Sequence, residues 1–354
     1  MSLKVSIIVP VYNIALKLPK GLESLAKQTY NNIEILLIND GSKDDSLAVC
    51  KSFAQKDKRF IVFDKENSGA GETRNLGLDH ATGEFVMFMD ADDWYEKDMI
   101  EKMMSWICSQ DDMDSVCCAR YNERQQGDGT YVTSSESPMD LPTDNYVIND
   151  IAEYIARLEE SRRFPYLWDK IYRRDIIEKC HIRFEKQFVT GQDNDFNIKY
   201  FRYIRKAMIS NECLYHYVKD GVGSLCARYK KDLYKIVSEL NRRKYALFNE
   251  YGMFENKEYL RIYANSYIAY LHTCIPNMFR DNAKLSIYEK NKLMKELLLD
   301  LNIKEYLPLY KAQTRIEIIF RFILKAKCPL FSVLIYSCLF FIRNNYEKIY
   351  NYIR

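Results

Sequence analysis

The sequence contains no C-x-x-C pair, although 10 of its 354 residues are cysteines. The cysteines are scattered, and no signal-peptide pattern precedes the first apolar run, so nothing indicates a disulfide framework. We therefore expect a reduced chain in the cytoplasm. A G-x-G-x-x-G fingerprint is also missing, which argues against dinucleotide binding through that motif.

Neither sign of charge is in large excess. The 52 Lys and Arg residues nearly balance the 49 Asp and Glu residues, so the formal net charge is only +3. This balance gives no argument for nucleic acid as a partner, and we expect none. A hydrophobic content of 47% with 29% charged residues is typical of a folded globular protein. Because a chain of 354 residues is longer than a single hydrophobic core usually supports, two domains are expected.

The N-terminal third alternates short apolar runs with segments of helical spacing. The strand candidates are residues 4–11, 33–38, 60–63 and 85–89, and the helix candidates between them are residues 16–28, 44–55 and 71–80. This alternation predicts an α/β domain with a parallel sheet covered by helices. Ligands of such sheets bind outside the carboxyl ends of the strands.

Three carboxylates follow the fourth apolar run directly. Asp90, Asp92 and Asp93 would crowd like charges about 5 to 7 Å apart along an extended backbone. Such crowding is unfavourable unless a cation or strong donors are present. A divalent metal that prefers oxygen ligands, Mg²⁺ or Mn²⁺, is the simplest partner. The alternative is that these acids cap a helix over residues 94–107.

Polar residues follow the other strand candidates too. Tyr12, beside Asn13, could flank a base or a ribose, and Asp40 could accept from a uracil-like imide or from ribose hydroxyls. The alternative for Asp40 is an Asx turn that caps the next helix. Glycines in residues 67–71 would let the backbone approach a ligand closely. Arg74 offers a fork of donors for phosphate or carboxylate, or is simply a solvated surface residue.

Five segments together resemble the family 2 glycosyltransferases, which have the GT-A fold. They are KVSIIVPVYN at residues 4–13, QTY at 28–30, NIEILLINDGS at 32–42, the N-x-G-x-x-x-x-R-N pattern at 67–75 and FMDADD at 88–93. The resemblance is close over about residues 4–120. It implies a Rossmann-like, mostly parallel sheet with helices on both faces and a nucleotide-sugar donor, usually a UDP-sugar.

The resemblance also implies roles for particular residues. A divalent metal, Mn²⁺ or Mg²⁺, would be held by Asp92 with Asp90 beside it. The residues implied near the nucleotide are Pro10, Tyr12, Asn13, Asp40, Lys65, Gly69, Arg74, Asp90 and Ala91.

Residues 121–225 are expected to recognise the acceptor. Residues 191–196 resemble the G-E-D-x-x-F pattern whose aspartate is the general base, so Asp193 takes that role by resemblance. The chain departs from the pattern at Gln192, where an acid is usual, and Gln192 is itself a candidate acceptor contact. Asp195 is a less favoured substitute base, and Asp193 as a helix N-cap is the non-catalytic alternative.

Further acceptor contacts are expected from three residues outside that pattern. Residues 168–174 resemble a W-x-K-x-Y-R-R segment of non-processive bacterial members, which points to Trp168 and Lys170. An aromatic ring with a polar neighbour is suited to stacking on a sugar, although such a Trp is often a core residue. His216 is a candidate for a metal or phosphate contact, with a purely structural role as the alternative.

The resemblance implies an inverting transfer in which Asp193 deprotonates an acceptor hydroxyl. One sugar is expected per encounter, because the Q-x-x-R-W segment of processive synthases is absent. The expected product is a capsule, exopolysaccharide or other cell-surface glycan, and the acceptor a saccharide or lipid-linked saccharide. Two alternatives remain: a catalytically weak nucleotide-sugar-binding module, supported by Gln192, and a sugar nucleotidyltransferase, whose glycine-rich loop is missing.

The expected domains are residues 1–225, with nucleotide-sugar (1–120) and acceptor (121–225) parts, and a helical region, residues 226–354. That region is a candidate for homo-oligomer formation. Its tail, residues 314–354, carries five excess positive charges, and its longest uncharged run, residues 328–342, is short of the roughly 20 residues that span a bilayer. We expect the tail to lie on the inner face of the plasma membrane. The alternative is a helix packed in the bundle or in an oligomer interface.

Overall fold

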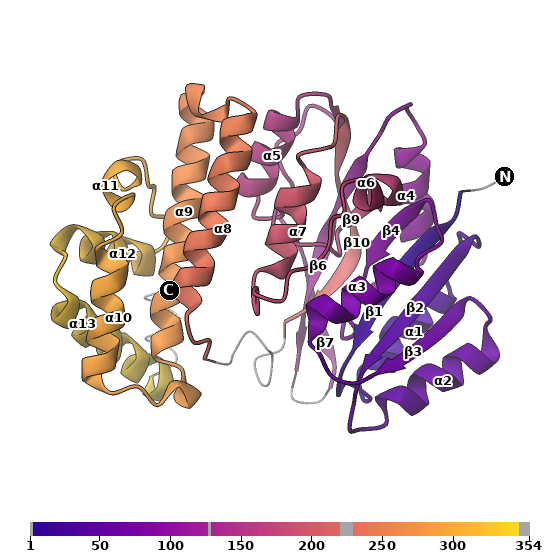
Figure 1. Ribbon diagram of the computed structural model, residues 1–354, viewed down its shortest axis with the longest axis horizontal. Coiled ribbons are helices and arrows are strands. Elements are labelled where there is room, and N and C mark those ends of the chain that lie inside the picture. The colour runs from indigo at the N-terminus through magenta and orange to yellow at the C-terminus, as the bar shows by residue number, and fades with distance from the viewer. Residues whose placement is uncertain (1–2, 127–128, 220–228, 347–354) are drawn as a thin grey trace. The chain divides into compact units, whose positions relative to one another are not determined.

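The computed structural model describes residues 3–126, 129–219 and 229–346 (Figure 1). The chain divides into two compact units, Met1–Asp220 and Gly221–Arg354. The first unit is α/β and the second is built from helices.

Four parallel strands form the first half of the sheet in the N-terminal unit, in the order β3-β2-β1-β4. They are β1 (Val5–Val11), β2 (Ile33–Asp40), β3 (Phe60–Lys65) and β4 (Phe85–Phe88). Helices α1 (Leu18–Ala26), α2 (Ser46–Lys56) and α3 (Ala70–His80) connect them. The predicted parallel, helix-connected arrangement is confirmed.

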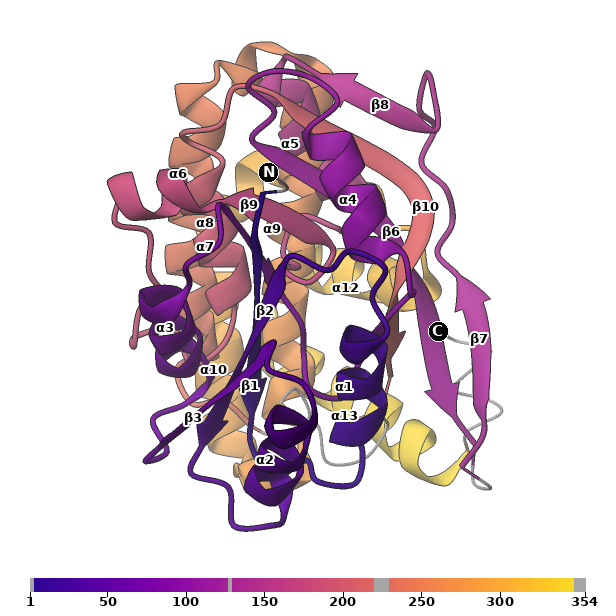
Figure 2. The same ribbon diagram turned by 90° about the vertical axis from the view of Figure 1, so that its right-hand side faces the viewer.

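Helices cover both faces of these strands, because successive side chains of a strand point to opposite sides. Val5, Ile7 and Val9 of β1 belong to one core cluster with Leu22 of α1. Ile8, between them, instead lies against α3, and the two helices are on opposite sides of the sheet in Figure 2. Burial on both faces explains why β1 reads as a continuous apolar run.

The second half of the sheet is mixed, and its order continues β4-β9-β6-β10-β5. Strand β9 (Lys170–Arg173) pairs antiparallel with both β4 and β6 (Ser115–Gln125), and β10 (Ala207–Val218) runs parallel to β6. The remaining elements of this unit are β5 (Trp94–Tyr95), α4 (Met99–Ile107), β7 (Tyr131–Ser135), β8 (Asn145–Ile148), α5 (Ile151–Glu160), α6 (Arg174–Lys179) and α7 (Gln192–Tyr200).

Two local predictions from the sequence differ from the structure of this half of the sheet. The helix alternative for residues 94–107 is wrong at its start, because Trp94 and Tyr95 pair with β10 as strand β5 and α4 begins only at Met99. The apolar run at residues 115–122 predicts a strand and residues 133–144 a polar loop, but β6 extends to Gln125 and β7 pairs with it, which draws residues 131–135 into the sheet. The first difference arises from a strand partner that lies far away in the sequence, and the second from a neighbouring strand that forms a hairpin with β6.

The C-terminal unit contains the helices α8 (Leu233–Glu250), α9 (Lys257–Met278), α10 (Ile287–Leu298), α11 (Ile303–Tyr306), α12 (Arg315–Ala326) and α13 (Pro329–Asn345), with 3₁₀ turns at Met253–Glu255 and Asp281–Ala283. Capping boxes begin α10 at Ser286 and α12 at Thr314, which satisfies backbone donors at both starts. The predicted helical character of this region is confirmed. None of the helices in the described ranges has the length and hydropathy needed to cross a membrane.

Gly77 permits the close packing of α3 on β1, and its replacement tests this contact. A Cβ atom built at Gly77 would lie 2.4 Å from Cγ2 of Ile8. We expect Gly77→Ala to lower the free energy of unfolding by about 1 to 3 kcal/mol, since α3 must move outward. Urea unfolding measures the effect. Lys51→Ala, at an exposed position on α2, is the control and should change stability by less than about 0.5 kcal/mol; equal effects would contradict the packing argument.

Candidate active site

Asp40, at the end of β2, holds the loop that precedes α3. Its carboxylate accepts from the backbone N–H of Ser68 at 2.8 Å and of Gly69 at 2.9 Å, and it pairs with the ammonium of Lys65. Burial alone would raise the pKa of Asp40, but the bonds from Lys65 and the two amides lower it. The Asx-turn alternative is wrong, because Asp45 and not Asp40 is the N-cap of α2.

The loop after β1 is tied to the loop after β2. Asn13 donates its backbone N–H to Ser42 Oγ at 3.0 Å, and its side-chain oxygen accepts from the backbone N–H of Lys43 at 2.7 Å. Pro10 is half-buried within β1, whereas the side chain of Tyr12 is exposed. These contacts place an accessible aromatic ring at the carboxyl edge of the sheet.

The three carboxylates after β4 have different surroundings. Asp93 is 1% exposed and accepts from Tyr215 Oη at 2.6 Å and from the backbone N–H of Val218 at 2.7 Å. Burial and then the charges of Asp92 and Asp90 raise the pKa of Asp93 well above its usual value. Asp93 therefore joins the end of β4 to β10, so its carboxylate already has partners within the protein.

Arg74 connects the end of β4 with the start of α7. Its Nη2 donates to Asp90 Oδ1 at 2.9 Å, and its Nη1 donates to Asp193 Oδ1 at 3.2 Å. Arg74 is buried, so the reading of a merely solvated surface arginine is wrong. Burial raises the pKa of Asp193, and the positive charge of Arg74 opposes this increase. The candidate base and the candidate metal cluster are thus held together by one guanidinium group.

Helix α7 presents Asp193 in its first turn, but the N-cap is the preceding glycine, with φ +73°. The N-cap alternative for Asp193 is therefore wrong. Asp195, the substitute base, is buried. Its carboxylate is already paired with the ammonium of Lys199 at 2.7 Å. The side chain of Gln192 packs on Gly71 of α3, where a Cβ atom would lie 2.8 Å from Gln192 Nε2. This contact lies beside the site and leaves the carboxylate of Asp193 in place.

Two of the predicted acceptor contacts lie in the interior. Trp168 is 3% exposed, and its ring stacks on Tyr166 at 4.7 Å and on Tyr215 at 4.3 Å between centroids. Lys170 is fully buried and its ammonium donates to Asp169 at 2.7 Å and to two backbone carbonyls at 2.8 Å. In the described structure both side chains belong to the core. The ring of Trp168 stacks on two other rings, and the ammonium of Lys170 already donates to three acceptors.

His216 is held between two carboxylates and two aromatic rings. Its Nδ1 lies 2.8 Å from Glu123 Oε1, and its Nε2 lies 2.9 Å from Glu96 Oε1. The imidazole stacks between Trp94, at 5.0 Å, and Tyr121, at 4.7 Å between centroids. These contacts favour the structural alternative for His216, since both ring nitrogens have partners within the protein.

A cation–aromatic cluster beside Asp92 was not predicted. The ammonium of Lys20 lies 3.0 Å from the ring centroid of Trp94 and 4.1 Å from that of Tyr131. Burial lowers the pKa of Lys20, and Glu123 opposes the shift. Trp94 directly follows the aspartate cluster, which was the available signal. Tyr131 lies on β7, whose pairing the sequence did not reveal.

Asp90 and Asp92 are suited to a divalent cation. Burial, followed by the negative charge of Asp90, raises the pKa of Asp92. A bound cation would relieve both effects, and carboxylate oxygens are the ligands that Mg²⁺ and Mn²⁺ prefer. Ala91, between the two, is buried. Across the described ranges no three His, Cys, Asp or Glu side chains are grouped to hold a metal, so substrate oxygens would complete such a site.

The model of Glycosyl transferase family 2 matches residues 6–210, more than half of the chain. The chain belongs to this family. EpsH of Bacillus subtilis (strain 168), provisionally named a glycosyltransferase, is 32% identical over 292 residues, which cover 81% of this chain and 80% of EpsH. The uncharacterized glycosyltransferase EpsJ of the same strain is 30% identical over 70% of this chain and 71% of its own length.

The fold of this family 2 glycosyltransferase is similar to that of a solved relative. The crystal structure of S. aureus TarS 1–349 in complex with UDP-GlcNAc superposes with a TM-score of 0.68 and 21% identity, and covers 93% of this chain and 89% of that one. This similarity supports the GT-A fold predicted for the glycosyltransferase.

The adjacent carboxylates Asp92 and Asp93 are expected to affect stability in opposite ways. Asp93→Ala removes the acceptor of two buried donors and should lower the free energy of unfolding by about 2 to 4 kcal/mol. Asp92→Ala removes a repelled charge and should be neutral or slightly stabilising. Urea unfolding of both variants at pH 7 checks the difference, and similar losses would show that Asp93 is not the link to β10.

Proposed function

We propose that this glycosyltransferase is inverting and metal-dependent, and that it transfers one sugar from a UDP-sugar to a hydroxyl group of a saccharide or lipid-linked saccharide. Its place would be in the synthesis of a capsule, exopolysaccharide or other cell-surface glycan, at the cytoplasmic side of the plasma membrane. The observation that carries the proposal is the bridge from Arg74 to Asp90 and Asp193. The bridge joins Asp193, a carboxylate suited to act as a base, to Asp90, which belongs to the carboxylates suited to bind a metal ion and a diphosphate.

The nucleotide would bind at the carboxyl edge of the parallel strands. Tyr12 offers an exposed ring for the base, and Asp40 holds the backbone of Ser68 and Gly69 close to that edge. Lys65 adds a positive charge beside them. TarS, a protein of similar fold, has been solved in complex with UDP-GlcNAc, which supports a UDP-sugar as the donor.

A divalent cation would be held by Asp92 and Asp90. When bound, it would neutralise the negative charge that grows on the departing diphosphate. The contribution of the chain is to hold these two carboxylates at the end of the strand. Arg74 holds Asp90 through an ion pair, and Asp93 orients the strand end through Tyr215.

The base would be Asp193, which is partly exposed at the start of α7. One carboxylate oxygen accepts from Arg74, and the carboxylate takes the proton of the acceptor hydroxyl. The acceptor oxygen forms a bond to the anomeric carbon as the bond from that carbon to the diphosphate oxygen breaks. UDP departs on the opposite face, which inverts the anomeric configuration. Burial raises the pKa of Asp193 and makes it a stronger base, while the positive charge of Arg74 opposes this increase.

The decisive test is turnover with a panel of UDP-sugars, with Mn²⁺ or Mg²⁺ and with a chelator. Slow, metal-dependent hydrolysis of at least one donor is expected without an acceptor. Failure with every UDP-sugar, together with binding of UDP, would instead support the inactive binding module that Gln192 suggested.

Asp193→Asn should bind the same donor with unchanged affinity but lose transfer by a factor of about 10² to 10⁴, the usual contribution of a general base. Initial rates and donor titration measure the two effects separately. Asp111→Asn, at an exposed position in the turn that follows α4, is the matched control and should keep wild-type rates. Near-normal transfer by the Asp193→Asn variant would show that Asp193 is not the general base.

The pH dependence tests the bridge itself. Asp193 acts only when ionised, so activity falls as the pH drops through its raised pKa. Arg74→Met removes the charge that opposes this increase, so the acid limb of the pH–rate profile should move to higher pH. Arg74→Lys keeps a positive charge and should move it less. An acid limb that stays in place or moves to lower pH in Arg74→Met would contradict the proposed coupling.

A further inference from the structure

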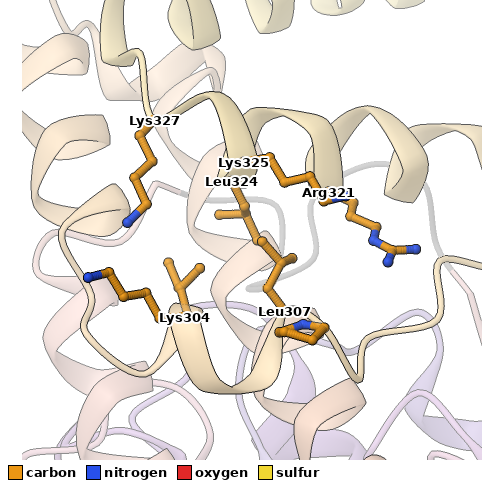
Figure 3. A pocket seen from close by; sticks show the side chains of 8 residues that line it. Lys304, Leu307, Arg321, Leu324, Lys325 and Lys327 are labelled. Carbon is orange, nitrogen blue, oxygen red and sulfur yellow. The ribbon is translucent and has the colours of Figure 1, made fainter.

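A pocket in the C-terminal unit combines an apolar floor with basic walls (Figure 3). Its volume is about 420 Å³, and it is formed by α11 and its following residues together with the C-terminal half of α12. Leu307 and Leu324 line the floor. The ammonium groups of Lys304 and Lys327 lie on one side of the pocket in Figure 3, whereas Arg321 extends to the other side.

The basic side chains of this pocket are not neutralised. Lys304, Arg321, Lys325 and Lys327 have no ion pair or side-chain hydrogen bond with any residue that the structure describes. The Nε atom of Arg321 is buried and also lacks a partner there. Lys325 and Lys327 stand at the C-terminus of α12, where positive charge is favourable. That effect explains neither Lys304 nor Arg321, so the set of four indicates an anionic ligand.

An exposed apolar face adjoins the pocket. It consists of Ile318, Phe322, Leu330, Phe331, Leu334 and Phe341, each between 44% and 60% exposed. On α12 the pair 318 and 322 is one helical turn apart, and on α13 residues 330, 334 and 341 share one side. The rings of Phe322 and Phe331 lie 6.4 Å apart, which joins the two helices into one face.

The opposite sides of α12 and α13 are already covered. His272 of α9 stacks on Phe320 of α12 at 4.4 Å between centroids and lies within hydrogen-bond distance of Tyr336 Oη of α13, at 2.8 Å. Phe320 and Tyr336 are buried. The apolar face is therefore not needed for the core of the unit, and burying it against a partner would gain free energy.

We propose that the basic pocket and the apolar face form one docking surface for an anionic lipid bilayer. A lipid phosphate group enters the pocket between Lys304, Arg321 and Lys327, and the side chains of the apolar face enter the boundary of the acyl chains. Basic residues beside bulky apolar ones are the combination that interfacial helices use. The inference rests on the proposed function only in placing the enzyme beside a lipid-linked acceptor.

Charge complementarity selects the bilayer over a second copy of the chain. A two-fold contact through this surface would bring two sets of four cations together, because such an interface uses the same patch on both subunits. Anionic headgroups instead neutralise all four. The surface also extends beyond the predicted tail, since Lys304 and Leu307 precede residue 314.

Flotation of the full chain with vesicles tests the docking surface. Vesicles of phosphatidylcholine alone should leave the protein unbound, whereas vesicles that also contain phosphatidylglycerol should bind it, less tightly at high salt. The combined change Lys304→Gln, Lys325→Gln and Lys327→Gln should weaken this binding about a hundredfold, since each basic residue at an anionic surface contributes about a fivefold factor.

The control removes the same charge from elsewhere in the unit. Lys257→Gln, Lys292→Gln and Lys295→Gln together change exposed lysines that do not line the pocket, and should weaken binding only a few-fold. Phe322→Ser with Leu334→Ser tests the apolar face and should also weaken binding at both salt concentrations.

Three results would overturn the proposal: equal binding of both lysine triple variants, wild-type binding that ignores phosphatidylglycerol, or loss of a wild-type oligomer in the Lys304, Lys325 and Lys327 variant. The comparison of the two vesicle compositions uses the wild-type chain, so it stands even if a variant folds poorly. Donor hydrolysis without vesicles should be unchanged in all variants. Failure of every donor would refute the proposed function and leave the vesicle result intact.

Discussion

The double ion pair of Arg74 is the interaction on which the candidate site depends. It connects Asp90, at the end of a parallel strand, with Asp193, which lies 119 positions from Arg74 in the sequence. The guanidinium of Arg74 is buried, so its removal would leave two neighbouring carboxylates without the cation that they share. The position and ionisation of the proposed base therefore depend on the same group that orients the proposed metal site.

Asp93 provides the second constraint, by an opposite use of a neighbouring carboxylate. It is directed into the protein and holds Tyr215 and Val218 of β10, whereas no strand residue in the described part of the chain makes such a bond to Asp92. Tyr215 in turn stacks on Trp168, which is a buried core residue. One strand end thus carries both a packing contact and the carboxylates of the candidate site, and the mixed half of the sheet supports the parallel half at that point.

In the C-terminal unit the same physical rule separates core from surface. Each of α12 and α13 has an apolar side that packs on α9 and an apolar side that is exposed. A helix with apolar residues on both sides needs a second partner. The four basic side chains near this face supply the chemical character of that partner, which apolar area alone would not specify.

The sequence by itself determined the parallel half of the fold, the helical C-terminal region and the candidate carboxylates. Local patterns suffice for these features, because buried strands, helical spacing and strand-end acids are encoded within short segments. Only the tertiary structure decided that Asp93 is directed into the protein, that Arg74 joins two distant acids, and that Trp168, Lys170 and His216 have partners inside the protein. These outcomes depend on contacts between residues up to 125 positions apart, such as the bond from Val218 to Asp93, which no local pattern records.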